Sequence, residues 1–160
     1  RIKRVSFGAG DFTRDMNLVW TGPEQELAYA RSRIVLASRA AGIESPIDSV
    51  FIDLKDREHL ELSTQKALEF GFQGKLCIHP DQVAPVNDAF TPGDDEVAKA
   101  ETIVAAFEAA EAEGSASIQI DGFFVDYPVV EQARRTIPEE SNQPTFGIIP
   151  HPALLGGKPR

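Results

Sequence analysis

Three short apolar runs alternate with segments of helical periodicity along the first part of the chain. The apolar runs, which predict buried strands, are residues 5–7, 49–52 and 75–78. The spacing of apolar residues after them predicts helices at about residues 21–41, 57–70 and 81–89. Gly42 and Gly71 follow the first two helices, at the position where glycine commonly ends a helix.

Continuous apolar strands that alternate with helices are typical of a parallel sheet covered by helices, so the predicted fold class is α/β. In such sheets the residues that carry chemistry collect at the carboxyl ends of the strands. Asp11, Asp53 and His79 follow the three runs and therefore share the predicted edge. Three strands are too few for a complete doubly wound domain. A (β/α)8 barrel needs about five more, so a barrel would be represented only by its last part.

The pattern changes after Pro92. Residues 94–114 predict one long amphipathic helix, and residues 116–120 and 123–125 predict a hairpin around Asp121-Gly122. A further helix is expected from about residue 129 to residue 137. We therefore predict a segment of parallel sheet and helices at 1–91, a helix–hairpin–helix extension at 92–137, and an irregular tail at 138–160 that is either a loose terminus or an arm on another subunit.

Composition narrows the possible partners. The formal net charge is -9, with acidic and basic residues interspersed, which argues against nucleic acid or an anionic membrane as the main partner. An anionic small substrate remains compatible, because a local metal or arginine can override the overall field. The single cysteine, Cys77, excludes an internal disulfide and fits a cytoplasmic location. The absence of a starting methionine suggests the later part of a longer protein.

Asp11 is the strongest candidate for chemistry. It follows Gly8-Ala9-Gly10, where glycines allow a sharp turn and a close approach of a small ligand to the backbone amides. A carboxylate at the end of a buried strand needs a cationic partner, and Mg2+ prefers a few carboxylates and water. The alternative is that Asp11 only caps the following helix.

The other polar candidates have ordinary structural interpretations as well. Asp15 could share an ion with Asp11 on one helical face, but pairing with Arg14 is favoured. Asp53 is either a second ligand or a partner of the charged residues that follow it. The position of His79 is more consistent with a hydrogen-bonded structural residue than with a base. The position of Asp126 is consistent with a cap of the last helix. Cys77 is expected in the core, with no neighbour that would lower its pKa.

Several longer motifs resemble the carboxyl-terminal half of the citrate lyase beta subunit / malyl-CoA lyase family (HpcH/HpaI aldolase–citrate lyase). These motifs are Phe7–Phe12 with Asp15, Val50–Asp53, Phe72–Val83, Val86–Pro92 and Asp121–Pro128. The resemblance extends in unbroken order from about Val5 to Ile137. The segment after Ile137 matches nothing in the family.

The resemblance implies a (β/α)8 TIM barrel, of which strands six to eight are present here, followed by the C-terminal extension. By this resemblance Asp11 would bind Mg2+ together with a Glu from the preceding half of the barrel. The same half would supply an arginine that polarises the substrate. The amides around Gly10 and Asp11 would receive the carboxylate of a 2-oxo or hydroxy acid. Asp126 would reach a neighbouring subunit's site as the catalytic acid, so a catalytic role is now favoured over a cap. Gly10 departs from the family, in which an acidic residue is frequent.

The implied activity is Mg2+-dependent, reversible Claisen cleavage of a 3-hydroxyacyl-CoA thioester of the malyl, citramalyl or citryl type. The expected partners are a CoA thioester and a 2-oxo acid, with assembly as a homotrimer or hexamer and a requirement for the N-terminal half of the barrel. Two alternatives remain at this point. One is a citrate lyase beta subunit acting on a citryl acyl carrier protein, and the other is a non-catalytic scaffold subunit of the same fold.

Overall fold

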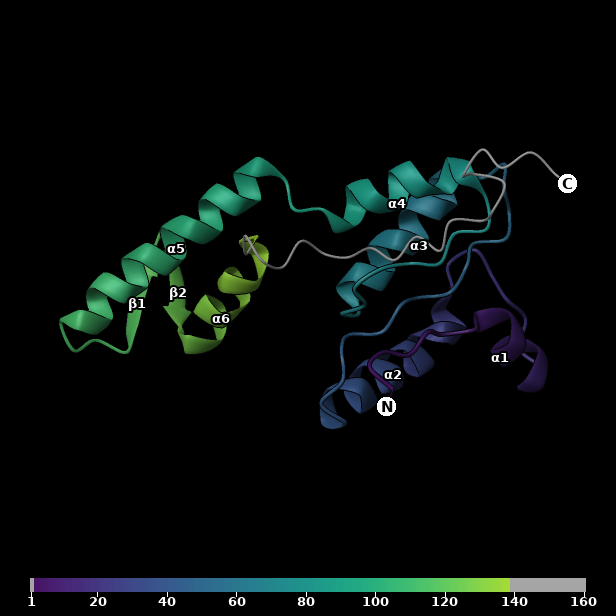
Figure 1. The fold of residues 1–160 in the computed structure, drawn as a ribbon, viewed down its shortest axis with the longest axis horizontal. Helices are drawn as coiled ribbons and strands as arrows, with labels where there is room; N and C mark the ends of the chain where they lie inside the picture. Colours follow the sequence, from purple (N-terminus) through teal and green to yellow (C-terminus); the bar gives the residue numbers. More distant parts are fainter. Residues whose placement is uncertain (1, 139–160) are drawn as a thin grey trace, which may run out of the picture. The chain divides into compact units, whose positions relative to one another are not determined.

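The structure is a computed structural model that describes residues 2–138. It divides into two compact units between Pro92 and Gly93 (Figure 1). The first unit contains short parallel backbone pairings and several helices, and the second contains two helices and a hairpin. The predicted tail lies outside the described residues from position 139 onward.

The helices of the first unit follow the predicted order. They are α1 (Ala9–Asp15), the 3-10 turn η1 (Gln25–Leu27), α2 (Ala28–Ala40), α3 (Arg57–Glu69), the 3-10 turn η2 (Pro80–Gln82) and α4 (Val83–Phe90). Gly42 and Gly71 adopt positive φ values of 62° and 89° directly after α2 and α3. This left-handed conformation is the one in which glycine ends a helix without strain.

Three backbone segments of the first unit pair in parallel, and we call them the ladder segments: residues 5–7, 46–48 and 73–76. The bridges join Ser6 to Ile47 and Asp48 to Lys75. Backbone hydrogen bonds join the middle segment to the segments on both of its sides. The Phe7 amide donates to Ile47 O at 2.9 Å and the Ile47 amide to Val5 O at 3.0 Å, while the Asp48 amide donates to Gly74 O at 2.8 Å. The predicted parallel arrangement of three neighbouring segments is thus present.

The predicted continuous strands are wrong in extent. The middle segment pairs at Ile47 and Asp48 rather than across residues 49–52, and the third pairs only at Lys75. The side chain of Gln82 accounts for the early end of pairing. Its amide nitrogen donates to Phe51 O at 2.8 Å, and its amide oxygen accepts from the Ile78 amide at 2.9 Å. Backbone groups that would otherwise extend the ladder are therefore satisfied by one buried side chain.

The hydrophobic core of the first unit lies between the ladder segments and the helices. Its main cluster contains Phe7, Ala9, Leu27, Ala30, Ala67 and Phe72. A smaller cluster joins Phe51, Leu60 and Val86. Because Phe7 and Ala9 both belong to the main cluster, the chain enters α1 directly from the core.

The second unit is a helix–hairpin–helix. Helix α5 (Asp94–Ala112) precedes strands β1 (Ser117–Ile120) and β2 (Phe123–Asp126), and α6 (Tyr127–Thr136) follows. The strands pair antiparallel around Asp121 and Gly122, whose φ values are both positive, as a two-residue hairpin turn requires. Phe107, Val125 and Val130 form the buried centre of this unit. The bounds of these helices and strands differ from the predicted ranges by no more than two residues at either end.

No helix between residues 2 and 138 is both long and apolar enough to cross a bilayer.

Candidate functional site

The first turn of α1 carries the leading candidate residues, and it begins one turn earlier than the sequence suggested. Gly8 is the N-cap and Ala9 the first helical residue, so Asp11 lies inside a helix rather than at the end of a strand. The buried Ala9 amide donates to the Ser49 hydroxyl at 3.0 Å. The Thr13 hydroxyl donates to Ala9 O at 2.9 Å. The turn is therefore fixed to the core on one side.

Asp11 presents its carboxylate to solvent, with 80% of the side chain exposed. It forms an ion pair with the exposed Arg14, whose Nη1 lies 3.4 Å from Asp11 Oδ1. No side chain caps α1, so the interpretation of Asp11 as the helix cap is not supported. A carboxylate with only one long, solvent-exposed ion pair remains available to another cation.

The residues present fit a divalent cation as a partial ligand set. The Asp11 carboxylate is a hard oxygen donor of the kind that Mg2+ prefers. Among the described residues, no group of three or more His, Cys, Asp or Glu side chains could hold a metal ion. Asp11 would therefore supply one ligand, and the others would come from residues beyond 2–138 or from solvent.

Gly10 lies beside Asp11 and is exposed. Its amide and that of Asp11 belong to the first turn, where a helix has no carbonyl to accept from them. A Cβ added at Gly10 would meet Trp20 Cζ3 at 3.8 Å, an ordinary van der Waals distance. A side chain at this position, including the acid that is frequent in the family, is therefore sterically permitted.

Asp15, Asp53 and His79 have local partners. Arg14 donates to Asp15 Oδ1 from Nη2 at 3.1 Å, which agrees with the favoured solvent ion pair. The Asp53 carboxylate accepts from the Lys55 amide at 3.0 Å.

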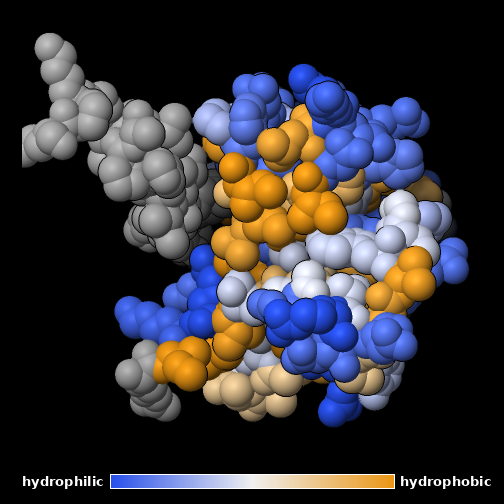
Figure 2. Space-filling view, turned by 90° about the vertical axis from the view of Figure 1, so that its right-hand side faces the viewer, coloured by the Kyte–Doolittle hydropathy of each residue, from blue (hydrophilic) through white to orange (hydrophobic). Residues whose placement is uncertain are grey.

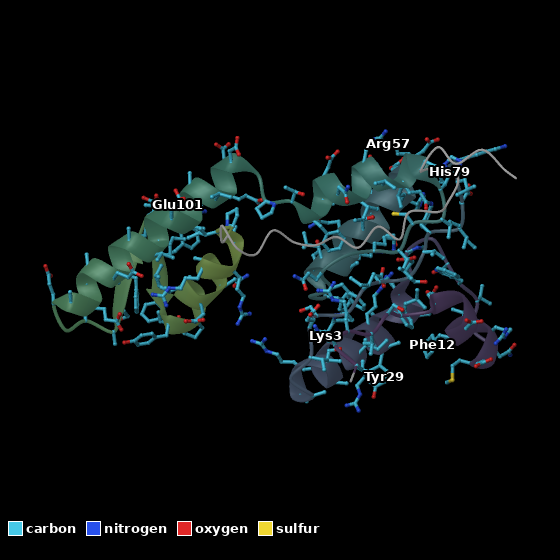
Figure 3. The ribbon with its side chains drawn as sticks, in the orientation of Figure 1. Lys3, Phe12, Tyr29, Arg57, His79 and Glu101 are labelled. Atoms are coloured by element: carbon cyan, nitrogen blue, oxygen red, sulfur yellow. The ribbon has the colours of Figure 1, made fainter. Side chains whose placement is uncertain are left out.

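His79 is the N-cap of η2, where its Nδ1 accepts from the Asp81 amide at 3.3 Å. Figure 3 shows His79 well separated from Phe12 of α1. Asp11, Asp53 and His79, which were expected at one edge, form no metal-binding group among the described residues.

Asp126 ends β2 and occupies the N-cap position of α6, yet its side chain makes no capping hydrogen bond. It is half-buried and pairs with Ser117 in the hairpin register. The neighbouring Tyr127 packs edge-to-face on Phe107, with ring centroids 5.1 Å apart, and donates to Glu111 Oε1 at 2.8 Å. The Asp126 carboxylate therefore does not cap α6, although it occupies the N-cap position.

Cys77 corrects a prediction. It was expected in the core, but it is exposed and lies two residues after Lys75, where the third ladder segment pairs. Partial desolvation of the sulfur nevertheless raises the pKa of the thiol, against the opposing effect of Lys75. The sequence-based expectation that no neighbour lowers the pKa of this thiol is therefore wrong, although the net shift is upward.

The first unit also contains a buried cluster of charged residues that was not predicted from the sequence. Arg31 donates to Asp48 Oδ1 from Nε at 3.0 Å and to Oδ2 from Nη2 at 2.9 Å, and its Nη2 lies 2.9 Å from Glu24 Oε2. Lys75 Nζ donates to Asp48 Oδ2 at 2.9 Å and to the Ser63 hydroxyl at 2.9 Å. We call Glu24, Arg31, Asp48 and Lys75 the buried ion cluster.

The buried ion cluster is internally compensated. Burial lowers the pKa of Arg31, but Asp48 and Glu24 outweigh burial, and the net shift is upward. The signal in the sequence was the position of Arg31, four residues after Leu27 on the apolar face of its helix. Asp48 and Lys75 similarly adjoin apolar runs, and charged residues at such positions are rarely buried unless they are paired.

Comparisons with known proteins place this arrangement in a family. A profile of the HpcH/HpaI aldolase/citrate lyase family matches residues 1–80. The chain is 39% identical to the citrate lyase subunit beta of Leuconostoc mesenteroides subsp. cremoris over 137 residues, covering 86% of this chain and 45% of the relative. It is 34% identical to the mitochondrial citramalyl-CoA lyase of Rattus norvegicus over 136 residues, covering 85% and 40%.

A solved structure is similar as well. The CitE protein of Mycobacterium tuberculosis, crystallised with magnesium, acetoacetate and coenzyme A, superimposes with a TM-score of 0.68 at 27% identity. The match covers 82% of this chain and 49% of that one. The chain thus has an α/β fold of the citrate lyase beta type and spans about half the length of the relatives that it matches. It belongs to the HpcH/HpaI aldolase/citrate lyase family.

Proposed function

We propose that this chain is the carboxyl-terminal part of a Mg2+-dependent carbon–carbon lyase that cleaves a 3-hydroxyacyl-CoA thioester of the malyl, citramalyl or citryl type. The exposed Asp11 carboxylate at the start of α1 carries the proposal. The similar CitE structure, which contains magnesium, acetoacetate and coenzyme A, supports the same ligands here.

Asp11 would be a metal ligand, and the amides of Gly10 and Asp11 would bind the carboxylate of the hydroxy acid or 2-oxo acid. These amides have no acceptor within the helix, and the turn that carries them is fixed through Ala9 and Thr13. A bound Mg2+ supplies Lewis-acid stabilisation of the charge that develops on the oxo-acid oxygen. The position of Gly10 has space for a side chain. In the family, an acidic residue is frequent at this position.

Asp126 would act as the general acid that protonates the enolate of the leaving acyl thioester. In the reverse direction the same carboxylate removes the methyl proton of the acetyl thioester. Its half-buried position and the lack of a capping hydrogen bond support this role. The side chain would serve the site of a neighbouring subunit, which gives residues 92–137 the function of an intersubunit extension.

The proposed active site requires residues from outside this chain. Residues 1–91 would form the last three βα units of a (β/α)8 barrel, with the preceding units supplying a second metal ligand and a substrate arginine. A homotrimer or hexamer would bring Asp126 to its site. A cytoplasmic location is proposed from the single unpaired cysteine.

An assay of the complete enzyme tests the activity and the substrate together. It is supplied with Mg2+ and with malyl-CoA, citramalyl-CoA or citryl thioesters, and the products glyoxylate, pyruvate or oxaloacetate are measured. Asp11→Ala should abolish Mg2+-dependent turnover. Asp15→Ala is the matched control on the same helix, because its carboxylate is engaged by Arg14 and should not be needed.

The outcomes separate the alternatives. Turnover only with a citryl acyl carrier protein would identify a citrate lyase beta subunit instead. Activity that is unchanged by Asp11→Ala would favour a scaffold subunit whose catalytic site lies in another chain.

A further inference from the structure

We infer that Ser49 is a positioning residue for the metal-binding turn of α1, an inference that rests on the proposed role of Asp11. Ser49 is buried and touches no candidate ligand itself. Its hydroxyl accepts the hydrogen bond from the Ala9 amide at 3.0 Å. Through that bond it holds the start of the turn that presents Gly10 and Asp11.

The Ala9–Ser49 bond has no substitute in the structure. Ala9 is fully buried, so its amide cannot turn to water if the hydroxyl is removed. A buried donor without a partner is costly, and the first turn of α1 would shift to find one. The amides of Gly10 and Asp11 have no acceptor within the helix, so the position of the turn depends on the Ala9–Ser49 bond.

Ser49 itself is held rigidly by the residue before it. The Asp48 side chain accepts from Arg31 and Lys75, both fully buried. The Asp48 backbone pairs with the third ladder segment, through the Asp48 amide to Gly74 O and the Leu76 amide to Asp48 O. The buried ion cluster therefore fixes the backbone from which the Ser49 hydroxyl projects.

Trp20 forms a second connection between the buried ion cluster and the first turn of α1. Trp20 donates from Nε1 to Glu24 Oε1 at 3.3 Å. Its ring edge lies 3.8 Å from where a Cβ of Gly10 would be. Ser49 on one side and Trp20 on the other thus connect the buried ion cluster with the first turn of α1.

Mg2+ binding by the complete enzyme, measured by titration calorimetry without substrate, tests the inference. Ser49→Ala should raise the Kd for Mg2+ about tenfold, as loss of an outer-shell partner commonly does. Thr64→Val is the control, because it also removes a buried hydroxyl, one whose hydrogen bond to Leu60 O lies within α3. Its Kd should remain that of the unaltered enzyme, even though both variants lower the thermal midpoint.

Asp11→Asn separates this inference from the proposed function. If Asp11→Asn abolishes Mg2+ binding and Ser49→Ala leaves the Kd unchanged, the positioning role is overturned while the metal site stands. If Asp11→Asn binds Mg2+ normally, the metal assignment itself fails. An equal rise in Kd for Thr64→Val would show general destabilisation and would also overturn the positioning role.

Hydrogen exchange in the unaltered enzyme tests the contact even if Ser49→Ala fails to fold. Resolved by residue and without metal, the Ala9 amide should exchange much more slowly than the amides of Gly10 and Asp11. Equal exchange rates for the three amides would show that the Ala9–Ser49 bond does not hold the turn.

Discussion

Asp11 and Arg31 are both charged, but their surroundings give them opposite roles. Asp11 is exposed, with one long ion pair, and its proposed role is to bind a metal ion. Arg31 is fully buried and binds two carboxylates, so its charge is committed to the structure. The sequence pointed to Asp11 because of the glycines before it. The place of Arg31 on the apolar face of its helix indicated that it is buried, but not that Glu24 and Asp48 are its partners.

Removing the charge of Arg31 should destabilise the first unit strongly. Arg31→Met leaves Asp48 and Glu24 buried without their main cation, and breaking such a pair costs about 3–5 kcal/mol. Chemical denaturation of the complete enzyme measures the effect. Arg33→Met on the same helix is the control, since Arg33 is exposed, and its free energy of unfolding should stay close to that of the unaltered enzyme.

Cys77 should react slowly with alkylating reagents despite its exposure. Desolvation raises the pKa of its thiol, so at pH 8 a smaller fraction is thiolate than in a free cysteine, and the thiolate is the reactive form. Alkylation by iodoacetamide, followed by mass spectrometry from pH 7 to pH 10, should rise at a higher pH than for a model peptide. A midpoint below that of the peptide would contradict the assigned environment.

At the scale of elements, local signals predicted the helices and the hairpin well. Helices α3 and α5 begin at the predicted residues, and Gly71 and Gly122 hold the positive φ values that their turns need. The strand lengths were not predictable in this way. Pairing beyond Asp48 depends on Gln82, a side chain some thirty residues away whose role no local pattern reveals.

The second unit should depend on Phe107. This side chain is almost fully buried against Val125 and Val130 and stacks on Tyr127, so Phe107→Ala should lower the local stability by about 3–5 kcal/mol. Hydrogen exchange of α5 and α6 measures the loss as faster amide exchange. Phe123→Ala, with a side chain 71% exposed, should leave the exchange of α5 nearly as it was. Comparable losses in both variants would contradict this account of the core.

At the scale of the whole molecule, many large apolar side chains remain on the surface. Leu76 ends the third ladder segment, and Ile52, Leu54 and Ile78 follow the ladder segments; all four side chains are exposed. Figure 2 shows apolar side chains gathered in patches between polar ones on the face in view. The proposed barrel would cover these side chains with its preceding units. The motifs alone could predict the family but not what covers these residues.

Residues 1–160 on their own should therefore fail to form a stable monomer. Analytical ultracentrifugation of this segment should show self-association or aggregation, and addition of the preceding barrel segments should restore a defined species. A compact monomer that unfolds cooperatively would show that the exposed apolar residues need no partner.

The central claim is that a divalent cation binds the Asp11 carboxylate. Crystals of the complete enzyme soaked in Mn2+ as a substitute for Mg2+ test it directly by anomalous diffraction. We expect an anomalous peak at about 2.0–2.2 Å from a carboxylate oxygen of Asp11, a distance typical of a small hard cation. A peak elsewhere, or an Asp11 side chain bound only to protein donors at saturating Mn2+, would contradict the account.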